Sequence, residues 1–163
     1  MAPSISQTMT EQLGKLLMMQ HLMLTTAESC TGGLLAEMIT QIPGSSNWFE
    51  RGFITYSNNS KREMLGVSND TLESFGAVSE QTACAMVEGA LTNSRANVAV
   101  AITGIAGPDG ATDNKPVGTV CLAWQREGQQ IQSVTVQFKG DRQEVRQQAC
   151  LMAMQGLIDL LEK

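Results

Sequence analysis

The stretch "TTAESCTGG" at residues 25–33 places several hydroxyl groups, a carboxylate, a thiol and two glycines at one chain reversal. It follows a short apolar run and precedes residues 34–42, where apolar side chains recur at helical spacing. The pattern predicts a turn from a buried strand into a helix. Such a turn is either an ordinary helix cap, made by Ser29 or Thr31, or the floor of a binding site.

Helical and strand-like segments alternate on both sides of this turn. The expected helices cover residues 5–19, 34–42, 61–66, 68–76, 79–93 and a last segment that begins after the N-cap Asp141, and the expected strands cover residues 21–27, 51–57, 97–103, 119–125 and 131–138. Strands interleaved with helices predict an α/β fold, a three-layer α/β/α sandwich, and the closing hairpin makes its sheet mixed, although mostly parallel. A length of 163 residues fits a single domain covering residues 1–163.

Composition and charge exclude several classes of protein. The net charge is −5 and no cluster of Lys or Arg interrupts it, so we expect no nucleic-acid partner. No apolar run approaches the length of a membrane span, and residues 1–15 resemble no secretory signal. The four cysteines are scattered singly, at Cys30, Cys84, Cys121 and Cys150. We therefore expect a cytoplasmic protein with reduced cysteines, no membrane contact and no bound metal.

A long loop follows the most strand-like segment of the chain. Residues 104–118, "GIAGPDGATDNKPVG", contain no expected element, and loops of this length inside compact domains often carry function. In open α/β sheets, ligands bind outside the carboxyl ends of the strands. We therefore expect this loop and the turn at residues 28–33 to share one edge of the sheet.

The available side chains restrict the chemistry at that edge. The single histidine, His21, opens the first expected strand, and Ser29 lies beyond its far end. Eight extended residues at about 3.3 Å each put the two roughly 25 Å apart, so we expect no histidine-based triad here. The chain contains no cluster of metal ligands and no GxxxxGK[ST] loop.

A nucleophile whose base is a lysine, a tyrosine or a carboxylate then remains. The turn offers Ser29 and Cys30, and the backbone amides of Thr31, Gly32 and Gly33 at the start of a helix could bind an anion or an oxyanion. A capped turn without a site explains these residues equally well.

Two further segments carry candidate polar side chains, and the first of them could bring a phenol and an amine to the same edge. Tyr56 ends the second expected strand, and Lys61 follows at the start of a short helix. Burial, or a nearby cation such as Arg62 or Arg142, would lower the pKa of Lys61 toward neutrality and make it a base. Arg142 lies in the first turn of the last helix, where a positive charge opposes the helix dipole, which is compatible with a ligand site and equally with a solvated arginine.

Six motifs occur in one chain, in a fixed order, and their combination is specific. They are "TAESCTGG", "PGSSNWFERGFITYSNNSK", "GAVSEQTA", "ITGIAGPDG", "KPVGTV" and "GDRQEVR". Over residues 5–162 the sequence resembles the carboxyl-terminal domain of the competence/damage-inducible protein CinA family, in the stand-alone form that acts as a nicotinamide-nucleotide amidohydrolase. The other common architecture of that family adds an amino-terminal domain, which we do not expect in a chain of this length.

The resemblance implies an activity and a set of residues. The family hydrolyses the carboxamide of nicotinamide mononucleotide to nicotinate mononucleotide and ammonia, which serves NAD recycling, and its members are usually homo-oligomers that need no metal or other cofactor. Catalysis falls on Ser29, Tyr56 and Lys61. Further polar contacts implied by the resemblance fall on Ser46, Thr103 and Arg142. We also expect substrate contacts from Gly104 and from the backbone amides of Thr31, Gly32 and Gly33.

Two alternatives remain open from the sequence. A different amidase could use the same serine and lysine on another small amide. A regulatory or otherwise non-catalytic nucleotide-binding protein could keep the fold without turnover, although intact Ser29, Tyr56 and Lys61 speak against it.

Overall fold

A computed structural model describes residues 2–163 of the chain. Its elements are α1 (Ile5–Met19), β1 (Leu24–Glu28), α2 (Leu34–Thr40), the 3-10 helix η1 (Ser45–Asn47), β2 (Phe49–Ile54), α3 (Asn58–Leu65), α4 (Asn69–Phe75), α5 (Glu80–Thr92), β3 (Val98–Gly104), β4 (Thr119–Arg126), β5 (Gln132–Gln137) and α6 (Arg142–Glu162). The expected order of helices and strands is confirmed, with η1 as an addition.

The five strands form one sheet in the order β2-β1-β3-β4-β5. Strand β1 pairs in parallel with both β2 and β3, whereas the pairs β3–β4 and β4–β5 are antiparallel. Four of the five strands therefore run in one direction and only β4 runs against them. The prediction of a mixed, mostly parallel sheet is confirmed.

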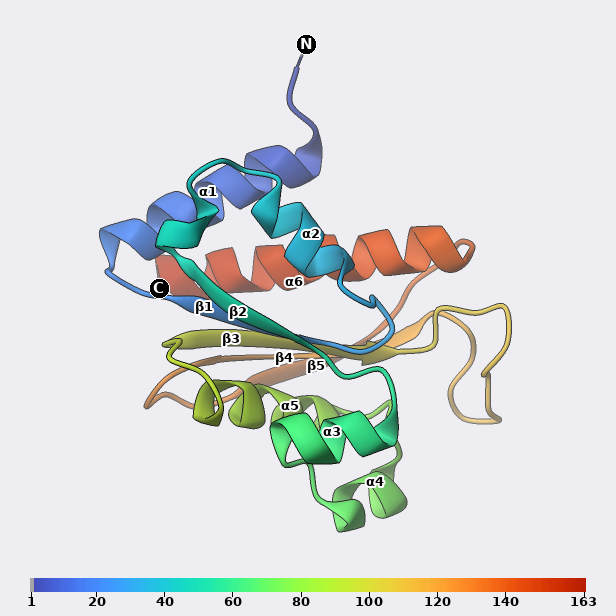
Figure 1. The fold of residues 1–163 in the computed structure, drawn as a ribbon. Helices are drawn as coiled ribbons and strands as arrows, with labels where there is room; N and C mark the ends of the chain where they lie inside the picture. Colours follow the sequence, from blue (N-terminus) through green and yellow to red (C-terminus); the bar gives the residue numbers. More distant parts are fainter. Residues whose placement is uncertain (1) are drawn as a thin grey trace.

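Helices cover both faces of this sheet and make the expected three layers. Helices α1, α2 and α6 lie on one face, and α3, α4 and α5 lie on the other (Figure 1). Each face has its own core, because side chains of a strand alternate between the two faces. Val98, Val100 and Ile102 of β3 pack toward α1 and α6, while Ala99 and Ala101 pack toward α5. The small alanines bring α5 close to the sheet.

The connections around β1 create the position for a site. Helix α2 links β1 to β2 across one face, and α3 to α5 link β2 to β3 across the other (Figure 1). The chain therefore turns toward one face of the sheet after β1 and toward the opposite face after β2. Such a divergence leaves a crevice outside the carboxyl ends of the strands, and α/β sheets bind their ligands there.

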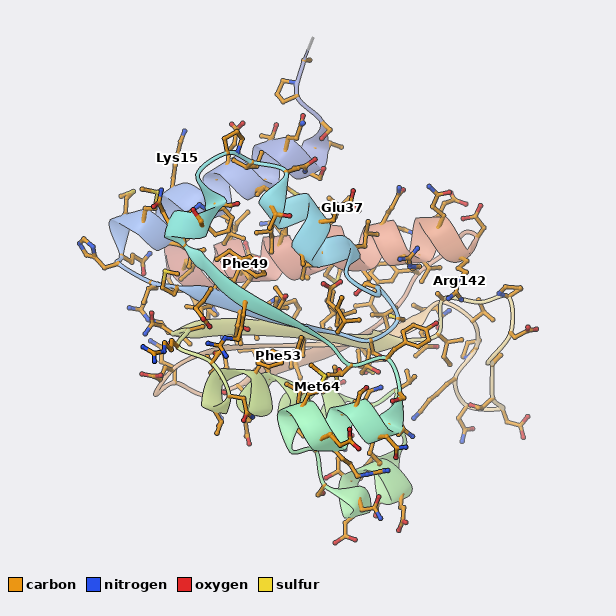
Figure 2. The ribbon with its side chains drawn as sticks, viewed as in Figure 1. Lys15, Glu37, Phe49, Phe53, Met64 and Arg142 are labelled. Atoms are coloured by element: carbon orange, nitrogen blue, oxygen red, sulfur yellow. The ribbon has the colours of Figure 1, made fainter. Side chains whose placement is uncertain are left out.

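A β-bulge in β2 decides which core each of its phenylalanines enters. Leu24 pairs with Phe49, but the next residue of β1 pairs with Arg51, so one residue of β2 is extra. Phe49 packs against the core on the α1 and α6 side, and Phe53, four residues later, belongs to the core around α5 (Figure 2). Without the extra residue, a period of two would put both rings on one face.

Several boundaries differ from the sequence-based predictions. Helix α3 begins at Asn58 instead of residue 61, because Ser57 and Ser60 form a reciprocal capping box at its start. Lys61 is therefore held within a helix that is already formed. His21 is exposed in a turn at φ 58°, before β1 begins, and not within the strand as expected.

Candidate active site

A pocket of about 270 Å³ opens at the carboxyl ends of β1, β2 and β3. The polar residues around it come from the β1–α2 turn (residues 29–33), from the segment after β2, from the β3–β4 loop (residues 105–118) and from the start of α6. They are Ser29, Tyr56, Asn58, Lys61, Thr103, Asp109 and Arg142. The expectation that the turn and the loop share one edge of the sheet is met.

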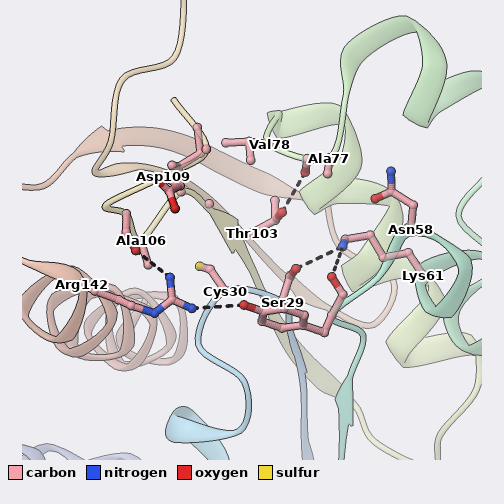
Figure 3. Close-up of a pocket in the computed structure, with 15 residues that line it drawn as sticks. Ser29, Cys30, Asn58, Lys61, Ala77, Val78, Thr103, Ala106, Asp109 and Arg142 are labelled. Carbon is pink, nitrogen blue, oxygen red and sulfur yellow. Dashed lines mark hydrogen bonds between the residues drawn. The ribbon is translucent and has the colours of Figure 1, made fainter. Parts of the chain in front are cut away.

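The centre of the pocket is a contact between Lys61 and Ser29. The Lys61 Nζ lies 3.0 Å from the Ser29 Oγ and 3.4 Å from the backbone oxygen of Tyr56 (Figure 3). Only 1% of Lys61 and 8% of Ser29 is exposed to solvent. A lysine ammonium is almost never buried so completely without a carboxylate partner. Among residues 2–163, no carboxylate lies within ion-pair distance of Lys61.

Burial lowers the pKa of Lys61, because the charged ammonium loses its hydration in this position. Nearby cations, which the sequence left open as a cause, contribute nothing comparable. Arg62 donates to Asn69 and Asn59 on the surface of α3 and α4, and Arg142 reaches toward Gly107. Lys61 therefore has the property of a general base: a neutral form accessible closer to physiological pH.

Glu28, which is 1% exposed, stabilises the β1–α2 turn through hydrogen bonds. Its carboxylate accepts hydrogen bonds from the Thr31 hydroxyl at 2.6 Å and from the amides of Gly33, Leu35 and Ala36 at 3.3, 2.9 and 3.1 Å. The amino end of α2 is thus occupied by a side chain of the protein itself.

This arrangement corrects one prediction from the sequence. Thr31, Gly32 and Gly33 do not line the pocket, and the amides of Gly32 and Gly33, which we expected to bind an oxyanion, already have acceptors within the protein. The Gly33 amide donates to Glu28, and the Gly32 amide donates to the Ser29 oxygen at 3.0 Å. Among residues 2–163, neither the Cys30 amide nor the Thr31 amide donates to a backbone oxygen of another residue, and of these two residues only Cys30 lines the pocket.

The Cys30 thiol is a poor nucleophile in this position. The residue is buried, and burial raises the pKa of its thiol to about 12. Because the thiolate is the reactive form of cysteine, this thiol is inert near neutral pH. Of the two candidates in the turn, the geometry favours Ser29.

Tyr56 and Arg142 close the other side of the pocket. The Arg142 guanidinium donates from Nη1 to the Gly107 oxygen at 2.7 Å and from Nη2 to the Tyr56 hydroxyl at 3.1 Å (Figure 3). Tyr56 is 61% exposed. Because its hydroxyl accepts from Arg142, the hydroxyl hydrogen is free to donate into the pocket.

Thr103 and Gly104 form the wall at the end of β3. The Thr103 hydroxyl donates to the Ala77 oxygen at 2.8 Å and connects β3 to the segment before α5 (Figure 3). A side chain at Gly104 would meet the backbone oxygen of Thr119 at 2.8 Å, so only glycine fits against β4 here.

Ser46 lies away from this pocket. It is exposed in η1, before β2 begins, whereas the pocket lies beyond the end of that strand. Six residues of strand at about 3.3 Å each separate the two positions by roughly 20 Å, so Ser46 cannot reach the pocket of its own chain.

One residue that the sequence analysis did not select contacts the turn directly. Arg146 of α6 donates from Nε to the Cys30 oxygen at 3.2 Å and from Nη2 to the Thr31 oxygen at 2.9 Å. Arg146 follows Arg142 by one helical turn, so both side chains leave the same face of α6. The four-residue spacing from Arg142 was the one feature of the sequence that could have pointed to Arg146 as a second residue near the site.

Residues 2–163 form neither an evident metal site nor a membrane span. Nowhere in that range do three or more His, Cys, Asp or Glu side chains group in a way that could hold a metal ion. The helices in the same range are all too short or too polar to cross a bilayer.

Comparison with known proteins gives consistent matches along the whole chain. A family model described as the CinA C-terminal domain matches residues 6–161. The chain is 50% identical to the nicotinamide-nucleotide amidohydrolase PncC of Pseudomonas putida over 153 residues, which cover 94% of this chain and 95% of that protein. It is 49% identical to the protein of the same name from Escherichia coli K12 over 157 residues, which cover 96% and 95%.

Longer proteins and solved structures match as well. A CinA-like protein of Akkermansia muciniphila is 49% identical over 144 residues, which cover 88% of this chain but 35% of that protein. The crystal structure of the competence/damage inducible protein CihA from Agrobacterium tumefaciens superposes with a TM-score of 0.95 at 44% identity, over 100% of this chain and 99% of that one.

Proposed function

The chain belongs to the CinA C-terminal domain family, and from that premise we propose that it is a nicotinamide-nucleotide amidohydrolase. It converts nicotinamide mononucleotide and water to nicotinate mononucleotide and ammonia. Relatives of nearly equal length carry this activity in their names.

One observation carries the proposal: the buried, unpaired Lys61 lies 3.0 Å from the Ser29 hydroxyl. A structural lysine at this position would be costly, because burial disfavours its charge and only two neutral oxygens, with no carboxylate, contact its ammonium group. A lysine with a lowered pKa beside a serine hydroxyl is the arrangement of a nucleophile with its base.

The first half of the reaction forms an acyl-enzyme. Neutral Lys61 accepts the proton of Ser29 as the Ser29 Oγ attacks the carboxamide carbon. The tetrahedral intermediate then collapses, the carbon–nitrogen bond breaks, and Lys61 returns the proton to the departing nitrogen. Ammonia leaves, and Lys61 is neutral again.

The negative oxygen of the tetrahedral intermediate needs a donor. We assign this role to the Cys30 amide, because Cys30 belongs to the pocket lining and its amide donates to no other residue among residues 2–163. The amide that follows a nucleophilic serine serves the same purpose in α/β-hydrolases. Tyr56 supports proton transfer through its hydroxyl, which Arg142 orients.

The second half of the reaction uses the same groups on water. Lys61 takes a proton from water, whose oxygen attacks the acyl carbon, and the bond to the Ser29 Oγ breaks. The proton on Lys61 returns to the Ser29 oxygen. The product leaves the acyl carbon as a carboxylic acid, which gives its remaining proton to solvent or to the released ammonia and so becomes the carboxylate. The free enzyme is restored, and the scheme uses neither a metal nor an organic cofactor.

Arg142 anchors the substrate phosphate in this proposal. Two of its five N–H groups are used by Gly107 and Tyr56, which leaves donors for an anion. Thr103 and Gly104 line the pocket beside the scissile amide. The product would return pyridine nucleotide to NAD synthesis in the cytoplasm, and we expect the protein to act as a homo-oligomer.

Ammonia release from the purified protein tests the proposal. We expect rapid release from nicotinamide mononucleotide, slower release from nicotinamide riboside and free nicotinamide, and none from glutamine or asparagine. A strong chelator should not change the rate. Faster release from another small amide would indicate a different amidase, and no release from any of them would indicate a non-catalytic protein.

A further inference from the structure

Arg146 binds the carbonyl side of the β1–α2 turn without entering the pocket. Its guanidinium group donates from Nε to the Cys30 oxygen at 3.2 Å and from Nη2 to the Thr31 oxygen at 2.9 Å. The side chain is half-buried, and it does not belong to the pocket lining. It therefore contacts the turn that carries the nucleophile but not the space that the substrate occupies.

The hydrogen bonds of the turn connect Arg146 to the free amide of Cys30. The Thr31 oxygen, which accepts from Arg146, belongs to the same peptide unit as the Gly32 amide. That amide donates to the Ser29 oxygen at 3.0 Å. The Ser29 oxygen in turn shares its peptide unit with the Cys30 amide. Two successive peptide units thus connect the guanidinium to the amide that we assign as the oxyanion donor.

Hydrogen bonds in such a chain polarise one another. A charged donor on the first carbonyl makes the amide of the same peptide unit a stronger donor, and the effect passes to the next unit. The charge on Arg146 thereby strengthens the Cys30 amide, while its second contact fixes the position of that peptide.

We propose that Arg146 is a positioning residue that orients and strengthens the Cys30 amide as the oxyanion donor, through the peptide units between them. This inference rests on the proposed function, because it assumes that Ser29 attacks a carbonyl. Glu28 complements Arg146. Its carboxylate accepts hydrogen bonds from a hydroxyl and from amides of the β1–α2 turn and the start of α2, whereas Arg146 donates to carbonyl oxygens of the β1–α2 turn.

The test compares Arg146→Ala and Arg146→Lys with a matched control on the same helix. Gln148→Ala is suitable, because the Gln148 amide also donates to two backbone oxygens, those of Lys139 and Glu144, but lies away from the turn. Loss of a complete oxyanion donor costs about 10²–10³ in kcat, so weakening one should cost roughly 10–30-fold. We expect that loss in kcat for Arg146→Ala, with KM within about twofold and the melting temperature close to that of the control.

Two added measurements separate positioning from a general structural effect. Guanidinium ions at constant ionic strength should restore part of kcat in Arg146→Ala and nothing in Gln148→Ala. Arg146→Lys should recover less than half of kcat, because one ammonium cannot reproduce the two-pronged contact. The low-pH limb of kcat should stay where it is in the wild type, because Lys61 is untouched.

An unchanged kcat, a loss confined to KM, a shifted low-pH limb or an equal loss in Gln148→Ala would each overturn the proposal. Labelling of Ser29 by a fluorophosphonate, followed by mass spectrometry, tests it without the nucleotide substrate, because attack on phosphorus also develops a negative oxygen. Labelling should be about tenfold slower in Arg146→Ala than in Gln148→Ala if the donor is weakened. Equal rates, or no labelling of Ser29 in the wild type, would contradict the inference even if the protein acts on another amide.

Discussion

The β1–α2 turn and the β3–β4 loop face the same pocket but are built in opposite ways. In the turn, Glu28 and Arg146 bind donor groups and carbonyl oxygens from two sides, and most of the residues are buried. In the loop, residues 108–114 are exposed. The backbone groups of Thr112 and Lys115 form two hydrogen bonds with each other.

The difference separates two tasks. Bond making and breaking need groups held within a fraction of an ångström, which buried hydrogen bonds provide. Substrate recognition tolerates an exposed segment, and Arg142 attaches this loop to the pocket through the Gly107 oxygen. Lys115 and Gln137 join the loop to the rest of the fold. Substitutions in and around the turn should therefore act on kcat or on stability, and those facing the loop should act on KM.

The largest effect should come from Ser29. Ser29→Ala removes the nucleophile and should lower kcat by about 10⁴-fold, with the fold intact. Cys30→Ala is the matched control in the same turn, and we expect less than about a threefold change because its thiol is unreactive. Steady-state ammonia release measures both. An inactive Cys30→Ala beside an active Ser29→Ala would identify the wrong nucleophile.

Lys61 should follow with about a 10³-fold loss in kcat, for Lys61→Arg as much as for Lys61→Ala, because arginine stays protonated at any usable pH. The folded state lowers the pKa of Lys61, so the neutral base forms as pH rises through that lowered value and kcat rises with it.

A pH–rate profile of wild type beside both Lys61 variants measures this limb. An arginine variant that keeps a large share of activity would make Lys61 a charge anchor instead of a base. Lys61→Met should also stabilise the protein at neutral pH and below. Protonation of the buried lysine opposes folding there, and a gain of about 1 kcal/mol would raise Tm by about 2–4 °C.

The contrast between the two regions should also appear in stability. Glu28→Ala leaves a buried hydroxyl and several amides without an acceptor, so we expect a loss of about 3 kcal/mol in the free energy of unfolding. Asp109→Ala in the exposed loop should change it by less than about 0.5 kcal/mol. Urea unfolding at equal slope compares the two. Equal losses would show that the loop is as firmly built as the turn.

Arg142 should give the smallest of these effects. Arg142→Ala should lower kcat/KM for nicotinamide mononucleotide by about 10–100-fold, mainly through KM, because a charge-assisted contact to the phosphate is lost. The riboside and free nicotinamide carry no phosphate and serve as internal controls. An equal loss on all three substrates would place Arg142 outside the phosphate site.

The order of residues was enough to predict the order of helices and strands and the edge of the sheet that carries the site. It was not enough to predict contacts that depend on the direction in which a side chain points. The strand-to-helix alternation predicted Ser29, Tyr56 and Lys61 at one edge, and the family resemblance added Arg142. The structure brings these four together. The amides of Gly32 and Gly33 are occupied within the turn, because Gly32 donates to the Ser29 oxygen and Gly33 donates to Glu28, which folds back onto the start of α2. No spacing rule indicates either contact.

Distances across the fold explain the other two differences. Ser46 precedes β2 and Tyr56 follows it, so a motif that is continuous in sequence spans both ends of the sheet. Arg146 was hidden because its partners are backbone oxygens, and carbonyl groups are identical at every position of a sequence. Only the folded turn makes these oxygens distinctive.

The absence of a carboxylate beside Lys61 within residues 2–163 also bears on how the product leaves. Nicotinate carries a carboxylate where the substrate carried a neutral amide, so the product itself becomes the counter-ion of a protonated Lys61. Product binding is then coupled to proton uptake and tightens as pH falls through the lowered pKa. At low pH two effects would slow the enzyme: its base is already protonated, and its product dissociates more slowly. Progress curves would therefore show product inhibition earlier than the initial rates alone predict.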